Sequence, residues 1–86
     1  MTMIEHLTKD SFKRKVFDYQ NSRMYRFEGV RPVVIDFYTN WCVPCKTIAP
    51  ILEELQREYE GKVDIYKVDS DMEKELVKAF NVRSIP

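Results

Sequence analysis

Residues 32–46 read PVVIDFYTNWCVPCK, and this stretch decides the fold of the 86-residue chain. Its first half, residues 32–38, is nearly continuous apolar sequence rich in β-branched residues, which is typical of a strand covered on both faces in a parallel sheet. Its second half places Cys42 and Cys45 where a segment with helical periodicity begins. The stretch therefore predicts a cysteine pair at a strand-to-helix junction.

The rest of the sequence continues the alternation of strand and helix. Residues 3–7 and 63–68 are the other two expected strands, and helical spacing of apolar residues follows each of the three strands. This order predicts an α/β fold with a mainly parallel sheet and helices on its faces. In such sheets, ligands and chemistry belong at the carboxyl ends of the strands.

Three helices are expected. Thr8 is predicted to cap the first helix, which runs to about residue 20; the second follows Cys42; and Ser70 with Glu73 forms a capping box for the third. Apolar stripes predict the buried faces of these helices, which are Phe12, Val16 and Tyr19; Ile48, Ile51, Leu52, Leu55 and Tyr59; and Met72, Leu76, Val77 and Phe80.

The composition limits the partners of the chain. It carries 14 basic and 14 acidic side chains with a formal net charge of zero, so it lacks the basic stripe that nucleic-acid binding requires. The N-terminus shows no leader pattern, and no apolar run has membrane-spanning length. We therefore expect one domain, residues 1–86, in the cytoplasm, with neither a nucleic acid nor a membrane as partner.

The cysteine pair has several interpretations. At a helix N-terminus, unpaired backbone N–H groups and the helix dipole favour a thiolate at Cys42, and Cys45 is expected to be better shielded. Such a pair exchanges disulfides through a mixed disulfide. A zinc site normally needs four ligands, and His6 is the only histidine. Covalent haem attachment needs histidine where Lys46 stands. A buried structural pair stays open beside the favoured redox function.

Asp36 is the second unusual residue, because it is a carboxylate inside the most apolar strand. Burial there is expected to raise its pKa. The favoured interpretation is a general base or proton relay for the two thiols, since perturbed carboxylates cluster at functional sites. The alternative is a buried structural acid paired with a neighbour such as Lys67.

Four segments together carry a family resemblance: Val34 to Tyr38, Trp41-Cys42-Val43-Pro44-Cys45-Lys46, Ile48 to Leu52, and Val82-Arg83-Ser84-Ile85-Pro86. In this order and spacing the chain resembles thioredoxin. The resemblance implies a three-layer βαβαβα arrangement with a short, mainly parallel sheet, without the C-terminal β-hairpin and last helix of the family.

The resemblance also implies roles for single residues. Cys42 would be the attacking thiol and Cys45 the resolving thiol of a redox-active disulfide, with Asp36 assisting Cys45 and Lys67 near that acid. The residues implied to contact the substrate are Trp41, Pro44, Ile85 and Pro86, the last of them a cis-proline. The implied partners are protein disulfides and an NADPH-dependent flavoprotein thioredoxin reductase; no bound cofactor and no metal are implied.

Three departures from the family pattern qualify these expectations. Val43 replaces the usual glycine, which affects the redox potential, and residues 21–31 form a longer connection than usual. Nothing follows Pro86, so we expect a C-terminally incomplete domain in which the strand of Asp36 is an edge open to self-association. The alternative functions are a fragment without effective catalysis, or a disulfide isomerase or oxidase relative.

Overall fold

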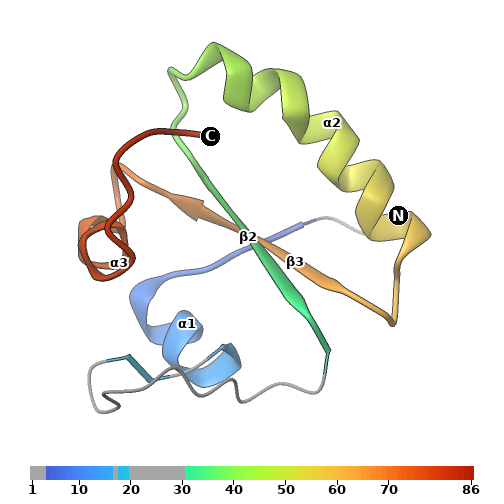
Figure 1. Cartoon of the computed structure of the whole chain (residues 1–86), viewed down its shortest axis with the longest axis horizontal. Helices are drawn as coiled ribbons and strands as arrows, with labels where there is room; N and C mark the ends of the chain where they lie inside the picture. Colours follow the sequence, from blue (N-terminus) through green and yellow to red (C-terminus); the bar gives the residue numbers. More distant parts are fainter. Residues whose placement is uncertain (1–3, 17, 20–30) are drawn as a thin grey trace.

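The computed structural model describes residues 4–16, 18–19 and 31–86. Strands and helices alternate along them: β1 Glu5–His6, α1 Lys9–Lys15, β2 Val33–Tyr38, α2 Val43–Glu58, β3 Asp64–Asp69 and α3 Lys74–Ala79. The strands form a parallel sheet in the order β1-β3-β2 (Figure 1). The predicted α/β class and element order are confirmed, and β2 lies at an edge of the described sheet, as predicted.

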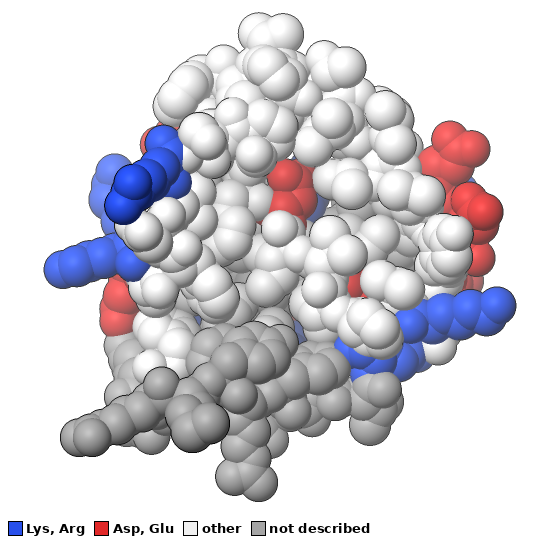
Figure 2. All heavy atoms as spheres, viewed as in Figure 1, with Lys and Arg blue, Asp and Glu red and all other residues white. Residues whose placement is uncertain are grey.

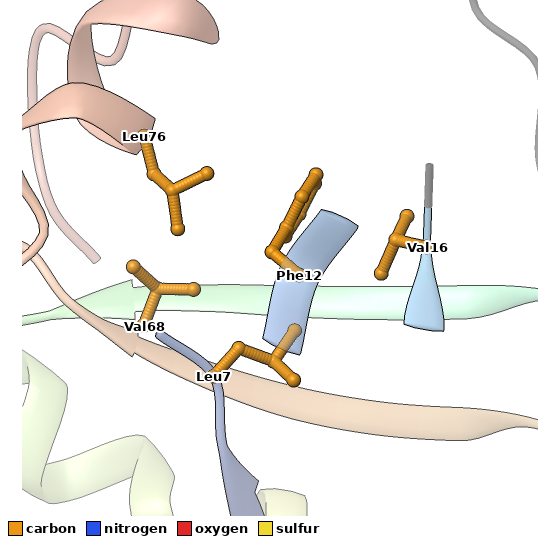
Figure 3. Close-up of a cluster of buried hydrophobic side chains, with 5 residues drawn as sticks. All are labelled: Leu7, Phe12, Val16, Val68 and Leu76. Atoms are coloured by element: carbon orange, nitrogen blue, oxygen red, sulfur yellow. The ribbon is translucent and has the colours of Figure 1, made fainter. Parts of the chain in front are cut away.

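The main hydrophobic core lies between the sheet and the two helices α1 and α3. Figure 3 shows its five buried members pointing toward one another: Leu7, Phe12, Val16, Val68 and Leu76. Ile35 and Phe37 of β2 pack against this cluster. Because side chains alternate along a strand, Val34 and Asp36 lie on the opposite face, toward α2. The alternation thus places a carboxylate on the face that carries the cysteine helix.

Helix α2 covers that second face less completely than its apolar stripe predicts. Ile51 is 54% exposed, and Leu55 and Tyr59 are also exposed, so the predicted burial of these three side chains is wrong. Ile48 and Leu52 line a cleft of about 540 Å³ between α2 and β2. Because the described sheet ends at β2, it offers the helix less apolar surface than the full stripe requires.

Helix α1 begins as predicted but ends early. Thr8 is its N-cap, and its hydroxyl oxygen accepts a hydrogen bond of 3.2 Å from the backbone N–H of Ser11. The helix ends at Lys15, well before the expected residue 20, which itself lies outside the described residues. Tyr19 still reaches the core, its ring centroid 5.8 Å from that of Phe12, but it does so from a turn rather than from a helix.

Strand lengths also depart slightly from expectation. Within the described residues β1 is limited to Glu5–His6, and β3 begins and ends one residue later than predicted. Residue 3 lies outside the described residues. Strand ends are set by pairing with a neighbouring strand, here through β3, and that pairing is invisible in the local sequence.

The predicted capping box between Ser70 and Glu73 is wrong. Glu73 occupies the N-cap position of α3 without a side-chain bond to that helix, and the Ser70 hydroxyl has no hydrogen-bond partner among the described residues. The Glu73 carboxylate instead accepts a hydrogen bond of 2.9 Å from the backbone N–H of Lys9, at the start of α1. A group expected to act locally therefore ties two distant helices together.

Residues 69–73, which we call the β3–α3 turn, are stabilised by Asp69. Its Oδ1 accepts hydrogen bonds from the backbone N–H groups of Asp71, at 2.9 Å, and Met72, at 3.3 Å. The turn leaves the Met72 side chain 77% exposed, so its predicted place in the buried face of the third helix is wrong. Leu76, in the same predicted face, is fully buried, as expected.

Candidate active site

Cys42 and Cys45 form a disulfide where β2 passes into α2, with their Cα atoms 5.2 Å apart. The chain turns after β2 through a hydrogen bond of 3.4 Å from the Cys42 N–H to the Thr39 carbonyl. Cys42 is the N-cap of α2, and its Sγ accepts a hydrogen bond of 3.2 Å from the backbone N–H of Cys45. The predicted junction of strand, cysteine pair and helix is confirmed.

The helix start favours negative charge at Cys42. The first turn of α2 contains no acidic residue, and Pro44 lies within it. Unpaired N–H groups and the positive end of the helix dipole therefore act on Cys42 without an opposing carboxylate in that turn. The expected difference in shielding is not present in the disulfide form, because Cys42 is 4% and Cys45 3% exposed. In the structure, the N-cap position rather than burial distinguishes Cys42 from Cys45.

Asp36 is 7% exposed, and its Oδ2 has no hydrogen-bond partner among the described residues. Burial raises the pKa of Asp36 above its ordinary value, and the positive charge of Lys67 opposes that rise. Among the described residues that line the cleft, Asp36 is the one with a charged side chain, and Figure 2 shows an acidic group at the floor of a hollow in a largely uncharged surface. Such a group takes up a proton more readily than a surface carboxylate does.

Lys67 is opposite Asp36 in the pairing of β2 with β3, but the described residues show no ion pair between them. Its ammonium lies 4.6 Å from the ring centroid of Tyr38. Lys67 also lines a cavity of about 120 Å³ together with Cys45. Lys67 is thus the strand-pairing neighbour of the buried acid and shares a cavity with the second cysteine, while Asp36 itself lines the larger cleft.

Trp41, immediately before Cys42, is 68% exposed and is held by its ring nitrogen. The indole Nε1–H donates a hydrogen bond of 2.9 Å to Oδ2 of Asp71. This bond joins the loop that carries the cysteines to the β3–α3 turn, at the carboxyl ends of two neighbouring strands. Sequence reasoning missed Asp71, although its position just after β3 is where the fold class places functional residues.

The peptide bond between Ile85 and Pro86 is cis, as the resemblance implies. Pro86 lines the same cleft as Asp36 and Ile48, and Figure 1 shows the C-terminal segment returning toward the end of β2. The structure therefore brings Pro86 onto the face of the sheet that carries the cysteine helix. Residues 20–30, most of the long connection, lie outside the described residues.

Exposed apolar side chains lie next to the disulfide in the chain and next to Asp71, the partner of Trp41. Trp41, Val43 and Met72 are 68%, 70% and 77% exposed, and Met72 follows the residue that holds the Trp41 indole. Across residues 4–16, 18–19 and 31–86, no helix has both the length and the apolar character to cross a bilayer. In the same residues no group of three or more His, Cys, Asp or Glu side chains is placed to hold a metal ion.

Comparison with known proteins places this arrangement in a family. The family model described as Thioredoxin matches residues 3–86. The chain is 50% identical over 80 residues to a thioredoxin of Borreliella burgdorferi, covering 93% of this chain and 68% of that protein. It is 41% identical over 83 residues to thioredoxin C-2 of Corynebacterium nephridii, covering 96% and 68%. A chloroplastic M-type thioredoxin of Spinacia oleracea is 41% identical over 75 residues, covering 85% of this chain and 41% of that protein. With this match and the disulfide at the start of α2, the chain belongs to the thioredoxin family of thiol–disulfide oxidoreductases.

Proposed function

We propose that the chain reduces disulfide bonds of other proteins, with Cys42 as nucleophile and Cys45 as resolving thiol. The observation that carries this assignment is the N-cap position of Cys42, where the helix stabilises a thiolate next to a turn bounded by exposed apolar side chains. The disulfide between Cys42 and Cys45 is the oxidised state of the cycle.

The reaction proceeds in two exchanges. The Cys42 thiolate attacks one sulfur of the substrate disulfide, a mixed disulfide forms, and the first substrate sulfur leaves as a thiolate. Cys45 then loses its proton and attacks Sγ of Cys42, which releases the second substrate thiolate and regenerates the Cys42–Cys45 disulfide. Two electrons pass from the cysteine pair to the substrate, and the substrate thiolates take up two protons.

Asp36 accepts the proton of Cys45 in this proposal. Its burial, its unpartnered oxygen and its raised pKa favour proton uptake, and Lys67 adjoins both the acid and the cavity that Cys45 lines. Trp41, Pro44, Ile85 and Pro86 contact the substrate chain. Support for this assignment comes from the exposure of the Trp41 ring and from the place of Pro86 on the cleft.

The oxidised pair must be reduced again before another turnover. We propose that an NADPH-dependent flavoprotein thioredoxin reductase does this and that the cycle runs in the cytoplasm. The two cysteines of the chain both belong to the motif, so no structural disulfide calls for an oxidising compartment. Reduction is favoured over oxidation or isomerisation because no histidine lies between the cysteines. Self-association through the edge strand β2 stays a prediction.

Two matched variants test the assignment, because each replaces one sulfur atom by oxygen. We expect Cys42→Ser to abolish reduction of a two-chain protein joined by a disulfide. We expect Cys45→Ser to form the mixed disulfide but not to resolve it, so that an adduct with the substrate accumulates and is seen by mass spectrometry without reductant. An adduct formed by Cys42→Ser instead, with none from Cys45→Ser, would reverse the assigned roles.

A further inference from the structure

A row of three residues runs across the whole described sheet. The strand pairing places His6 opposite Lys67 and Lys67 opposite Asp36. Residues paired in this way on neighbouring strands point to the same face of a sheet. The row therefore lies on the face covered by α2, where Lys67 shares a cavity with Cys45. An exposed imidazole, an ammonium and a buried carboxylate therefore follow one another along this face of the sheet.

The side chain of Tyr38 extends across the sheet on the same face as this row. It is two residues beyond Asp36 and so shares its face of β2. Its hydroxyl lies 2.9 Å from Nδ1 of His6, at the opposite edge of the sheet, and the two rings meet edge to face with centroids 5.6 Å apart. Since a phenol hydroxyl can donate or accept, this hydrogen bond forms with either tautomer of the imidazole. Tyr38 thus reaches from β2 across β3 to β1.

The aromatic ring of Tyr38 holds the Lys67 ammonium. Nζ of Lys67 lies 4.6 Å from the ring centroid, inside the range of a cation–π interaction. Among the described residues Lys67 forms no ion pair with Asp36, whose Oδ2 is left without a hydrogen-bond partner. Lys67 is long enough to reach the carboxylate of its neighbour, so the ring and the acid compete for one ammonium group.

We infer that Tyr38 is a positioning residue of the disulfide exchange: held by His6, its ring keeps Lys67 from pairing directly with Asp36, and the carboxylate stays available to take up a proton. The inference rests on the proposed role of Asp36. It assigns a role to two contacts of Tyr38, the hydrogen bond with His6 and the cation–π contact with Lys67.

The groups that act on this arrangement come from every element around it. Lys67 acts on Asp36 from β3, and burial of Asp36 is the larger influence on its pKa. His6 of β1 and Lys67 contact Tyr38, and the charges of Asp69 and Asp36 act on its hydroxyl. From α2, Lys46 and Cys45 line the cavity that Tyr38 and Lys67 share. Removing the ring frees Lys67 to approach Asp36, which lowers the pKa of that carboxyl.

The test follows the Asp36 carboxyl carbon by NMR titration of the reduced protein. We expect Tyr38→Leu to lower the titration midpoint of Asp36 by about one pH unit, the size of a partly desolvated cation–π contact. Tyr38→Phe keeps the ring and loses the bond to His6, so a smaller shift in the same direction is expected. Tyr59→Leu, at an exposed tyrosine beyond the end of α2, is the control and should leave the midpoint unchanged.

A double variant separates the action of Lys67 from a change in burial. In the Lys67→Met background, Tyr38→Leu should cause no further shift, because the ammonium is gone. An equal shift in both backgrounds would mean that the ring acts by excluding water, and it would overturn the inference. Should Tyr38→Leu not fold, an unchanged midpoint in Tyr38→Phe and in His6→Gln would overturn it as well.

Failure of the proposed function gives a different result. If Asp36 does not accept the proton of Cys45, Asp36→Asn and the unsubstituted chain would resolve the mixed disulfide at the same rate at every pH. This result would not depend on the titration midpoint of Asp36. If only the inference about Tyr38 fails, Asp36→Asn still slows resolution, while the Tyr38 variants leave the titration of Asp36 unchanged.

Discussion

Replacing Asp36 by asparagine should stabilise the protein while impairing its chemistry. The carboxylate is 7% exposed, its Oδ2 lacks a partner among the described residues, and burial raises its pKa. A buried polar atom without a partner costs about 1–3 kcal/mol, and more when it is charged. We therefore expect Asp36→Asn to raise the free energy of unfolding at pH 8 by about 1–3 kcal/mol.

The gain should depend on pH in a defined direction. Because the pKa of Asp36 is higher in the folded than in the unfolded state, the folded state binds more protons between the ordinary value of 3.8 and the raised value. The stability contributed by this group is therefore full below the ordinary pKa and is lost as the pH rises through the folded pKa. Each unit of difference corresponds to about 1.4 kcal/mol. Asparagine does not titrate, so Asp36→Asn does not lose stability in this way as the pH rises. The difference in free energy of unfolding between Asp36→Asn and the unsubstituted chain should therefore disappear near pH 4.

Urea unfolding of the oxidised protein between pH 4 and pH 8 measures this difference directly. Glu53→Gln, at an exposed carboxylate of α2, is the matched control and should not raise the free energy of unfolding. Equal stability of Asp36→Asn and the unsubstituted chain at pH 8, or a gain that stays constant down to pH 4, would refute the reasoning. In the same protein, resolution of the mixed disulfide should be slower.

Three further substitutions address the core, the site and a turn. Phe12→Ala should lower the free energy of unfolding by about 3–5 kcal/mol, because the ring is fully buried; a loss below about 1 kcal/mol in urea unfolding would contradict this. Asp71→Ala should lower kcat/KM for protein disulfides about three- to ten-fold by freeing the Trp41 indole, whereas Asp71→Asn, which keeps an acceptor, should not. Gly61→Ala should cost about 1 kcal/mol of stability for backbone reasons alone, since φ is +83° and nothing lies within 4 Å of the added Cβ; a neutral result would show that the turn adjusts.

The sequence predicted the structure correctly where a feature depends on residues close to it in the chain. The β-branched run of residues 33–38, the Thr8 cap and the cysteine pair at the start of α2 each depend on neighbours a few positions away. The buried face of α2 was not predicted correctly. The burial of Ile51 and Leu55 is decided by the area of sheet beneath the helix and not by the spacing of the apolar residues.

The contacts that sequence reasoning missed join residues from different elements. Glu73 bonds to Lys9 rather than to its own turn, and Trp41 finds Asp71 only once β2 and β3 are side by side. Tyr38 meets His6 because β1 and β2 flank the same strand. Strand order brings Tyr38 to His6 and Trp41 to Asp71, and packing of α1 beside α3 brings Lys9 to Glu73, so these contacts exist only in the assembled fold.

The β3–α3 turn is anchored on both sides by acidic side chains that belong to it. Asp71 holds the indole beside the disulfide, and Glu73 holds the first turn of α1. Through Asp71 in its middle and Glu73 at its end, this short segment connects the loop before the disulfide with the N-terminal helix by two hydrogen bonds of 2.9 Å. In the substrate complex that we propose, the position of the Trp41 indole would therefore depend on the position of the N-terminal helix, because this turn links the two.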